Sequence, residues 1–239
     1  MSYSLSYRDI EEMMLERGIH VDHSTINRWV IYYSPLLENE FRKNYKRKVG
    51  SSWRMDETYI KIKGIWHYFY RAIDKEGDTI DFMLSKKRDE AAAKAFFVKA
   101  IRSSGLPEKV TIDKSGANNA GINAINLQLI IFSLLGCVLM QINIRQVKYL
   151  NNIVEQNHRG IKRKTNPMMG IKAFHSAEAT LYGIKLYRML KKGQHFNVKN
   201  SAAFEQFYAL AAYSRLGEMR LLFLTGSNKF CDATLVSHT

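Results

Sequence analysis

The sequence predicts an α/β fold in which helices flank a mixed sheet, preceded by a small helical region. Two patterns favour this class. Between residues 53 and 85, apolar side chains alternate with polar ones, as is typical of strands. From residue 89 onwards, segments with helical spacing are separated by short apolar runs such as KVTID (109–113). The chain has 239 residues, which is enough for one full-sized domain and a small one.

The chain is strongly basic. Lysine and arginine number 36 against 22 acidic residues, which gives a net charge of +14. Such a surplus favours a polyanionic partner, with nucleic acid first and an anionic membrane second. The most apolar run (127–140) has the length of a buried core segment, so we expect no membrane span. Cys137 and Cys231 form no CxxC pair, which fits a reducing cytoplasm.

The first 41 residues are expected to form two short helices. Residues 4–17 have helical spacing and end at Gly18, and the second helix begins behind Asp22 or Ser24, which are both good N-caps. This pattern predicts a helix-turn-helix that binds DNA, although an ordinary helical hairpin fits it equally well. The second helix carries Asn27, Arg28 and Trp29. The basic stretch that follows (42–52) is expected to be a solvated linker.

The main domain is expected over residues 53–193, with a partly helical tail at 194–239. Three antiparallel strands come first, followed by a helix at 89–105 that begins with acidic residues and ends with glycine. The remaining expected elements are a strand at 109–113, a loop at SGANNAG (115–121), a helix and then a strand near 138–146, and helices from 151 and at 175–193. This order is that of a ribonuclease-H-like core.

Three carboxylates fall at related points of this predicted sheet. Asp56 lies within the first strand, Asp113 ends the fourth, and Glu155 lies on a helix after the fifth. If the first and fourth strands are neighbours, Asp56 and Asp113 lie side by side. Three such groups repel one another unless a divalent cation neutralises them, and magnesium suits oxygen ligands. Two magnesium ions would form the known arrangement for in-line attack on a phosphodiester.

The helix that contains Glu155 is rich in basic residues. Arg159 and Lys162 follow Glu155 by four and seven positions, which places all three side chains on one stripe. The two cations would then bind phosphates beside the metals. Read alone, the stretch fits an ordinary ion pair between Glu155 and Arg159 on a solvated helix just as well.

Other acidic and histidine residues are weaker candidates. Glu57 follows Asp56 directly, so pleating sends the two side chains to opposite faces of the sheet. Hairpin positions that read as turn or edge residues are Asp74, Asp78 and Asp81. His20 and His23 flank a turn without cysteine partners, so no zinc site is expected there. No GxxxxGK[ST] loop is present, so we expect no use of ATP.

Four segments together resemble the DDE transposases of bacterial insertion sequences, and most closely the insertion-sequence-six family. They are WRMDETYIKIKGIWHYFYRAID (53–74), TIDKSGAN (111–118), IRQVKYLNNIVEQNHRGIKR (144–163) and GIKAFHSAEATLYGIKLYRMLKKGQ (170–194). The resemblance extends from Ser6 to Ala212. It implies that Asp56, Asp113 and Glu155 are the catalytic metal ligands for two Mg²⁺ ions, with Mn²⁺ as a substitute.

The resemblance also implies the partners and the reaction. The segment 6–30 would bind terminal inverted repeats, and a further helical segment expected ahead of it is missing, so the region is expected to be shortened. The implied DNA-binding residues are Ser24, Thr25, Asn27, Arg28, Arg159, Lys162 and Arg163. Nicking by water would free a 3′-hydroxyl that attacks target DNA, in replicative, cointegrate-type transposition. A homodimer or larger transpososome associated with the bacterial nucleoid in the cytoplasm is expected.

Two other functions fit the sequence. One is a catalytically defective transposase remnant that acts only as a DNA-binding protein. The other is a plain nuclease of the ribonuclease-H type, which cuts RNA–DNA hybrids without strand transfer. The basic N-terminal region argues against the nuclease.

Overall fold

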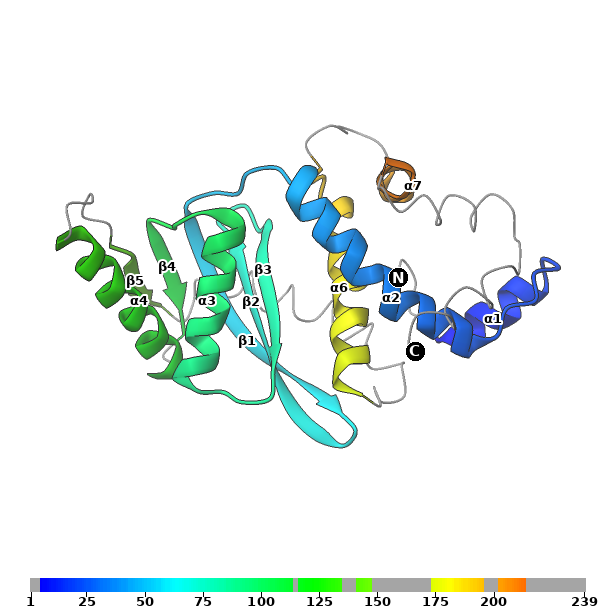
Figure 1. Ribbon diagram of the computed structural model, residues 1–239, viewed down its shortest axis with the longest axis horizontal. Helices are drawn as coiled ribbons and strands as arrows, with labels where there is room; N and C mark the ends of the chain where they lie inside the picture. Colours follow the sequence, from blue (N-terminus) through cyan, green and yellow to red (C-terminus); the bar gives the residue numbers. More distant parts are fainter. Residues whose placement is uncertain (1–4, 114–115, 135–140, 148–172, 196–201, 214–239) are drawn as a thin grey trace, which may run out of the picture.

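The computed structural model describes residues 5–113, 116–134, 141–147, 173–195 and 202–213 (Figure 1). Its helices are α1 (Tyr7–Leu15), α2 (His23–Asn44), α3 (Glu90–Ser104), α4 (Gly116–Leu134), α6 (Phe174–Lys191) and α7 (Ala203–Tyr213). Its strands are β1 (Ser52–Ile62), β2 (Ile65–Asp74), β3 (Thr79–Ser85), β4 (Lys109–Ile112) and β5 (Asn143–Gln146). The second and third strands match the predicted segments.

The five strands form one mixed sheet in the order β3-β2-β1-β4-β5. The first three strands are antiparallel neighbours, whereas β4 runs parallel to both β1 and β5. This topology, with two crossover connections through α3 and α4, is that of a ribonuclease-H-like core. The predicted fold class is therefore confirmed.

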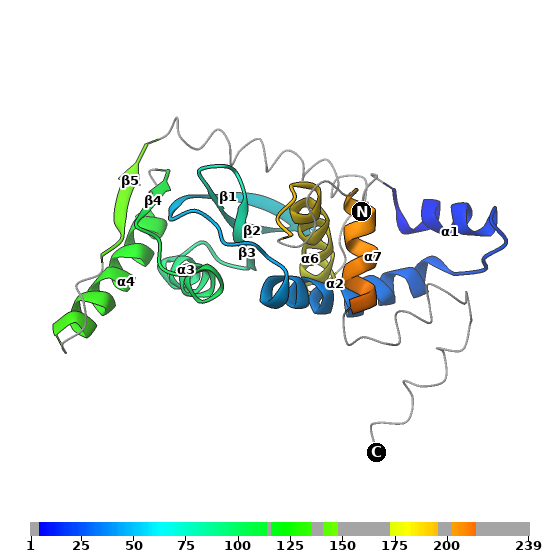
Figure 2. The same cartoon turned by 90° about the horizontal axis from the view of Figure 1, so that it is seen from above.

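Helices cover both faces of the sheet. On one face, α3 and α4 pack against a core that includes Met55, Phe96 and Ile122. On the other face, α6 packs against a second cluster, in which Leu181 meets Phe82. Figure 2 shows α3 and α6 on different sides of the strands. Each β1 side chain therefore faces one of two distinct helical layers.

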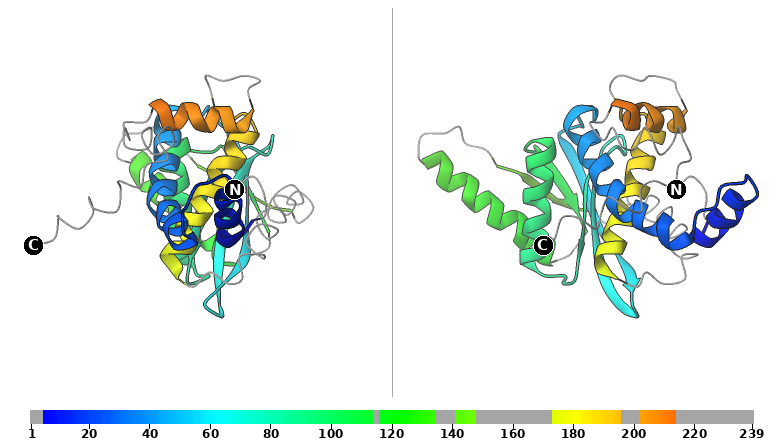
Figure 3. Two further views of the ribbon diagram at one scale, coloured as in Figure 1. Left: turned by 90° about the vertical axis from the view of Figure 1, so that its right-hand side faces the viewer. Right: turned by 45° about the vertical axis from the view of Figure 1, so that its right-hand side comes forward.

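The N-terminal helices are joined to this core through α6. Tyr33, Leu37 and Phe41 of α2 pack in one buried cluster against α6 and α7. The outermost helix, α1, contacts α2 but has no fully buried residue. Figure 3 shows α1 and α4 at opposite ends of the molecule. The two N-terminal helices are present, and a DNA-binding role for them stays a prediction.

The predicted loop at 115–121 is wrong, because α4 begins at Gly116. Close packing between two helices explains the glycine at position 121. A Cβ atom placed on Gly121 would lie only 2.8 Å from the Cβ of Ala93 in α3. Glycine thus allows the two helices to approach closely, and it lies within a helix rather than in a turn.

The sequence predicts that the apolar run at 127–140 is buried core. The part of it that the structure describes (127–134) instead carries exposed apolar side chains. Leu127 is 60 % exposed and Ile131 is 52 % exposed. Among the described side chains of α4, the fully buried apolar ones in this core are Ile122 and Ile125, both in its first half. In the part of the chain that the structure describes, no helix has both the length and the apolar composition needed to span a membrane.

The stretch 42–52 is not a solvated linker. Helix α2 continues to Asn44, and Arg42 forms a 3.0 Å ion pair with the buried Asp81. The amino group of Lys46 donates to the carbonyl oxygen of Ile80 at 2.7 Å, and Arg47 pairs with Asp78. Through these ion pairs and this hydrogen bond, the basic side chains attach the N-terminal helices to the β2–β3 hairpin.

Candidate active site

Asp56 lies on the face of the sheet that α6 covers. Side chains alternate along β1, and Ile60 and Ile62, which share the parity of Asp56, pack in the cluster with α6. Met55, of the opposite parity, lies in the core beneath α3 and α4. Asp56, Ile60 and Ile62 therefore lie on one face of the sheet. Asp56 itself is half-buried.

Asp113 directly follows β4 and is exposed. β1 and β4 are parallel neighbours, and Trp53 pairs with Val110. Both of these residues lie in the core beneath α3 and α4. Asp56 and Asp113 each come three positions later, so alternation directs both to the opposite face. The prediction that the first and fourth strands are neighbours is confirmed.

Two carboxylates at matching positions of parallel strands form a donor set suited to a divalent cation. Oxygen ligands from Asp56 and Asp113 fit magnesium, and a cation would offset the repulsion between two negative charges on one face. Asp113 is exposed, so DNA and metal have access to this end of the sheet. The residues present thus fit the metal that the sequence predicts.

Glu57 has a different environment from its neighbour Asp56. Its carboxylate forms an ion pair with Arg88 and accepts a 2.6 Å hydrogen bond from the side-chain amide of Asn118 in α4. The Glu57 side chain is only 5 % exposed. It therefore connects β1 to α4 and to the segment that precedes α3. The sequence showed that the two acids must point apart, and the structure shows that Glu57 has the structural contacts.

Four predicted site residues lie outside the described part of the chain: Glu155, Arg159, Lys162 and Arg163. Glu155 as the third ligand, and the three basic residues as DNA contacts, stay predictions.

The predicted DNA-binding residues of α2 lie in its first turns. Asp22 is the N-cap and accepts a 2.6 Å hydrogen bond from the backbone of Ser24. Ser24 and Arg28 are exposed, and Thr25 and Asn27 are half-buried. Arg28 donates to the hydroxyl of Thr25 at 2.8 Å. The backbone hydrogen bond from Ser24 lowers the pKa of Asp22, so its carboxylate stays ionised at the start of the helix.

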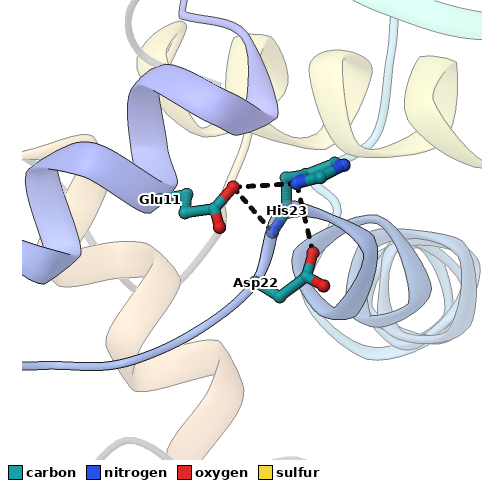
Figure 4. Close-up of side chains that lie close together, drawn as sticks. All are labelled: Glu11, Asp22 and His23. Atoms are coloured by element: carbon teal, nitrogen blue, oxygen red, sulfur yellow. Dashed lines mark hydrogen bonds and ion pairs between the residues drawn. The ribbon is translucent and has the colours of Figure 1, made fainter.

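A group of potential metal ligands joins α1 to α2, and Figure 4 shows its three side chains converging. Nδ1 of His23 lies 2.8 Å from Glu11 and 3.1 Å from Asp22. Glu11 also accepts from the backbone N–H of His23 at 3.2 Å. Within the described residues, the three ligand atoms lie within 4.8 Å of one another. Each group already has a capping or ion-pair partner, so the cluster is accounted for as a contact between the helices.

The acids of the β2–β3 hairpin are structural, and they are more buried than the sequence suggested. Asp74 is 3 % exposed and accepts from the backbone N–H of Gly50 and Asp78. Asp81 is 1 % exposed and pairs with Arg42 and Lys99. Burial raises the pKa of Asp74. Asp78 pairs with Arg47, so each of the three acids has a structural partner.

Two cations are buried beside the β2–β3 hairpin, and no sequence pattern indicated them. Lys185 of α6 is fully buried, and its amino group lies 4.9 Å from the ring centre of Phe82 and 5.3 Å from that of Phe69. Burial and the nearby Arg71 lower the pKa of Lys185 well below its usual value. Arg71 is also fully buried. A lysine in an amphipathic helix gives no sequence signal that it faces inwards.

Known proteins resemble this chain along most of its length. A family model described as a DDE domain matches residues 50–194. The transposase for insertion sequence-like element IS431mec of Staphylococcus aureus (strain Mu50 / ATCC 700699) is 42 % identical over 196 residues, covering 81 % of this chain and 82 % of that protein. The transposase for insertion sequence element IS257 in transposon Tn4003, also from Staphylococcus aureus, is 41 % identical over the same length and coverage.

Solved structures resemble it more distantly. The HTLV-2 integrase catalytic core domain in complex with magnesium has 16 % identity and a TM-score of 0.44, covering 66 % of this chain and 95 % of that one. The BIV integrase catalytic core domain has 13 % identity and a TM-score of 0.40, covering 67 % and 95 %. The matched domain and the staphylococcal relatives establish what the sequence motifs suggested: this chain belongs to the DDE transposases of bacterial insertion sequences, in the insertion-sequence-six family.

Proposed function

We propose that this chain binds the inverted-repeat ends of an insertion sequence and catalyses magnesium-dependent nicking and strand transfer in replicative, cointegrate-type transposition. The observation that supports it best is the register of the neighbouring parallel strands β1 and β4, in which Asp113, directly after β4, corresponds to Asp56. Family membership supports the proposed reaction class, and the correspondence of these two residues supports the proposed site.

Each residue has a defined task in this proposal. Asp56, fixed within β1, and Asp113, exposed at the end of β4, would hold the metal, with Glu155 as the third ligand. Magnesium, when bound, supplies positive charge that stabilises the charge developing on the phosphodiester during attack. Water first breaks the bond between phosphorus and the 3′-oxygen, which leaves a 3′-hydroxyl and a 5′-phosphate. That hydroxyl then forms a bond to a target phosphorus and releases a target 3′-hydroxyl.

DNA binding would use the basic surfaces. The net charge of +14 favours phosphate contacts, and such binding weakens steeply as salt rises. The first turns of α2, with Ser24 and Arg28 exposed, would read the terminal repeats. Because transposition joins two element ends, we also propose that at least two copies of the chain assemble on DNA.

Strand transfer by the purified full chain tests the proposal. A labelled duplex that ends in the terminal repeat is incubated with a plasmid target and magnesium, and joined product is measured. Asp113→Asn should abolish joining and leave binding unchanged. Glu108→Gln is a matched control, because Glu108 is an exposed carboxylate at the other end of β4. Joining that survives Asp113→Asn would refute the assignment, and binding without joining under any divalent cation would favour the defective-remnant alternative.

A further inference from the structure

The hairpin between β1 and β2 projects beyond the rest of the sheet. Pairing of β2 with β3 begins at Tyr68, and β1 pairs with β4 over residues 52–54. Among the described strands, residues 60–67 therefore pair only with each other, as a two-stranded ribbon. Figure 1 shows this ribbon extending past the ends of the other strands. Lys63 and Gly64 form its tight turn, with φ angles of 49° and 83°.

One face of the ribbon carries a set of aromatic and basic side chains, here named the tip platform: Tyr59, Lys61, Trp66 and Tyr68. The strand register pairs Tyr59 with Tyr68 and Lys61 with Trp66, so all four share one face. Trp66 is 58 % exposed and Tyr59 is 44 % exposed. The Tyr59 ring lies 5.3 Å from that of Tyr68, and the amino group of Lys61 lies 5.6 Å from the Trp66 ring centre.

The opposite face of the ribbon is held by the body of the protein. Ile60 and Ile62 pack in the cluster with Ala177 of α6, and the His67 ring lies 5.4 Å from that of Phe174. Arg88 approaches the base of the tip platform, with 3.4 Å between its guanidinium and the Tyr59 hydroxyl. The platform is therefore presented on a fixed support.

The composition of the tip points to nucleic acid. Residues 59–66 contain two lysines and no acidic residue. Exposed aromatic rings beside cations are the arrangement that binds unpaired bases, because every base has a face for stacking and every nucleotide carries a negative charge. Protein interfaces are instead depleted of lysine at their centre.

The location of the platform relates it to the carboxylates. Lys61 lies five residues beyond Asp56 along β1, which is about 17 Å of extended strand. DNA advances about 3.4 Å per nucleotide along one strand, so this length corresponds to about five nucleotides. The platform lies on the α3 face of the sheet and the carboxylates lie on the α6 face, so a strand held at Asp56 and Asp113 would have to pass around the edge of the sheet to reach it.

We propose that the tip platform stacks against unpaired bases of the DNA end, and that Trp66 is the main contact. The inference rests on the proposed function, since it takes the bound DNA to be the element end. It adds a preference for frayed or unpaired ends over fully paired duplex.

Binding of the full chain to two DNA ends tests this inference. One duplex is fully paired, and the other has the same sequence with its last three nucleotides unpaired. Trp66→Ala should weaken binding to the unpaired end by about 10-fold and to the paired end by less than about 2-fold. Trp66→Phe keeps a ring and should restore most of the affinity. Ile65→Ala is the matched control, because Ile65 is 65 % exposed and alternation places it on the other face of the same ribbon.

The results of these binding measurements distinguish base stacking from other roles of the tip platform. Equal loss on both duplexes, or no loss, would overturn the proposal. So would a change from dimer to monomer in sedimentation with unchanged DNA affinity, because the tip would then be a contact between copies. If wild-type protein failed to join DNA yet lost selective binding on Trp66→Ala, the proposed function would fail and the stacking contact would stand.

Discussion

Asp113, which directly follows β4, corresponds to Asp56 of β1 in the register that pairs these two parallel strands. Ser52 pairs with Lys109, which lies 57 positions later, and Asp113 lies the same 57 positions after Asp56. The number of residues between the two acids therefore equals the offset between paired residues of β1 and β4. That register, and not proximity along the chain, brings two carboxylates to one face at the end where β4 stops.

Replacing Asp56 by cysteine should distinguish a metal ligand from a structural acid. A thiolate is a poor ligand for magnesium and a better one for softer metals. We expect Asp56→Cys to lose joining in magnesium and to recover part of it in manganese. Joining is measured in magnesium and in manganese. The control variant Asp56→Ala should be inactive in both. Activity of Asp56→Cys in magnesium equal to wild type would exclude Asp56 as a ligand.

Glu57 should tolerate neutralisation where Asp56 does not. Glutamine keeps a hydrogen-bond acceptor for Asn118 and loses only the charge opposite Arg88. We expect Glu57→Gln to lower the free energy of unfolding by about 1–2 kcal/mol and to retain magnesium-dependent joining. Urea denaturation and the joining assay measure the two effects. Loss of joining at unchanged stability would place Glu57, and not its neighbour, among the ligands.

The contrast between these neighbours shows what the sequence could predict. Pleating requires Asp56 and Glu57 to point apart, and the parity of Ile60 and Ile62 shows which acid shares their face. Contact of Glu57 with Arg88 and Asn118 depends on how the segment before α3 and helix α4 pack on the sheet, which alternation does not encode. The strands and the long helices were predictable because apolar residues recur along each of them with the period of that element, so that one face is apolar.

The errors have a common cause in tertiary contacts. SGANNAG resembles a loop because glycine and asparagine favour turns, yet Gly121 serves close packing against Ala93. The stretch 42–52 resembles a solvated linker because it is basic, yet Asp78 and Asp81 lie opposite it in the folded chain. A charged or glycine-rich segment is assigned wrongly when its partner is far away in sequence.

Asp81 should be essential for attaching α2 to the sheet. Asp81→Asn would leave Arg42 buried, at 12 % side-chain exposure, without its charged partner in β3. We expect the free energy of unfolding to fall by about 1–3 kcal/mol, because the guanidinium loses its charged partner in β3 and keeps the ion pair with Glu38. Glu40→Gln, in the same helix, affects a carboxylate that accepts a hydrogen bond from Asn44 and should change it by less than about 0.5 kcal/mol. Equal effects of the two variants in urea denaturation would contradict this attachment.

Stability should rise between pH 8 and pH 10. Burial lowers the pKa of Lys46 from its usual 10.5 to about 8, and burial lowers that of Lys192 to about 8 as well. Between these values the folded protein binds fewer protons than the unfolded chain, so stability increases with pH. We expect Lys46 to contribute on the order of 1–2 kcal/mol of this rise. Above about pH 10 the trend reverses, since burial raises the pKa of Tyr70 and of Tyr182 to about 12.

Urea denaturation at pH 8 and pH 10 measures this rise, and Lys46→Met identifies its source. The methionine variant keeps the buried stem and removes the titrating group, so the rise should become smaller. Lys43→Met is a suitable control, because Lys43 is an exposed neighbour in α2. A pH dependence that is identical in wild type and Lys46→Met would rule out the lysine as its cause.

Gly121 should be intolerant of a single methyl group. Alanine there would place its Cβ 2.8 Å from the Cβ of Ala93 and 3.0 Å from the backbone nitrogen of Lys94, so α4 must move away from α3. We expect Gly121→Ala to lower the free energy of unfolding by about 1–3 kcal/mol. Gly116→Ala, in the same helix with no atom within 4 Å of the new Cβ, should be neutral or gain up to about 1 kcal/mol. The double variant Gly121→Ala with Ala93→Gly removes the closest clash, so it should recover part of the loss. If it recovered none in urea denaturation, contact between these two helices would not explain the glycine.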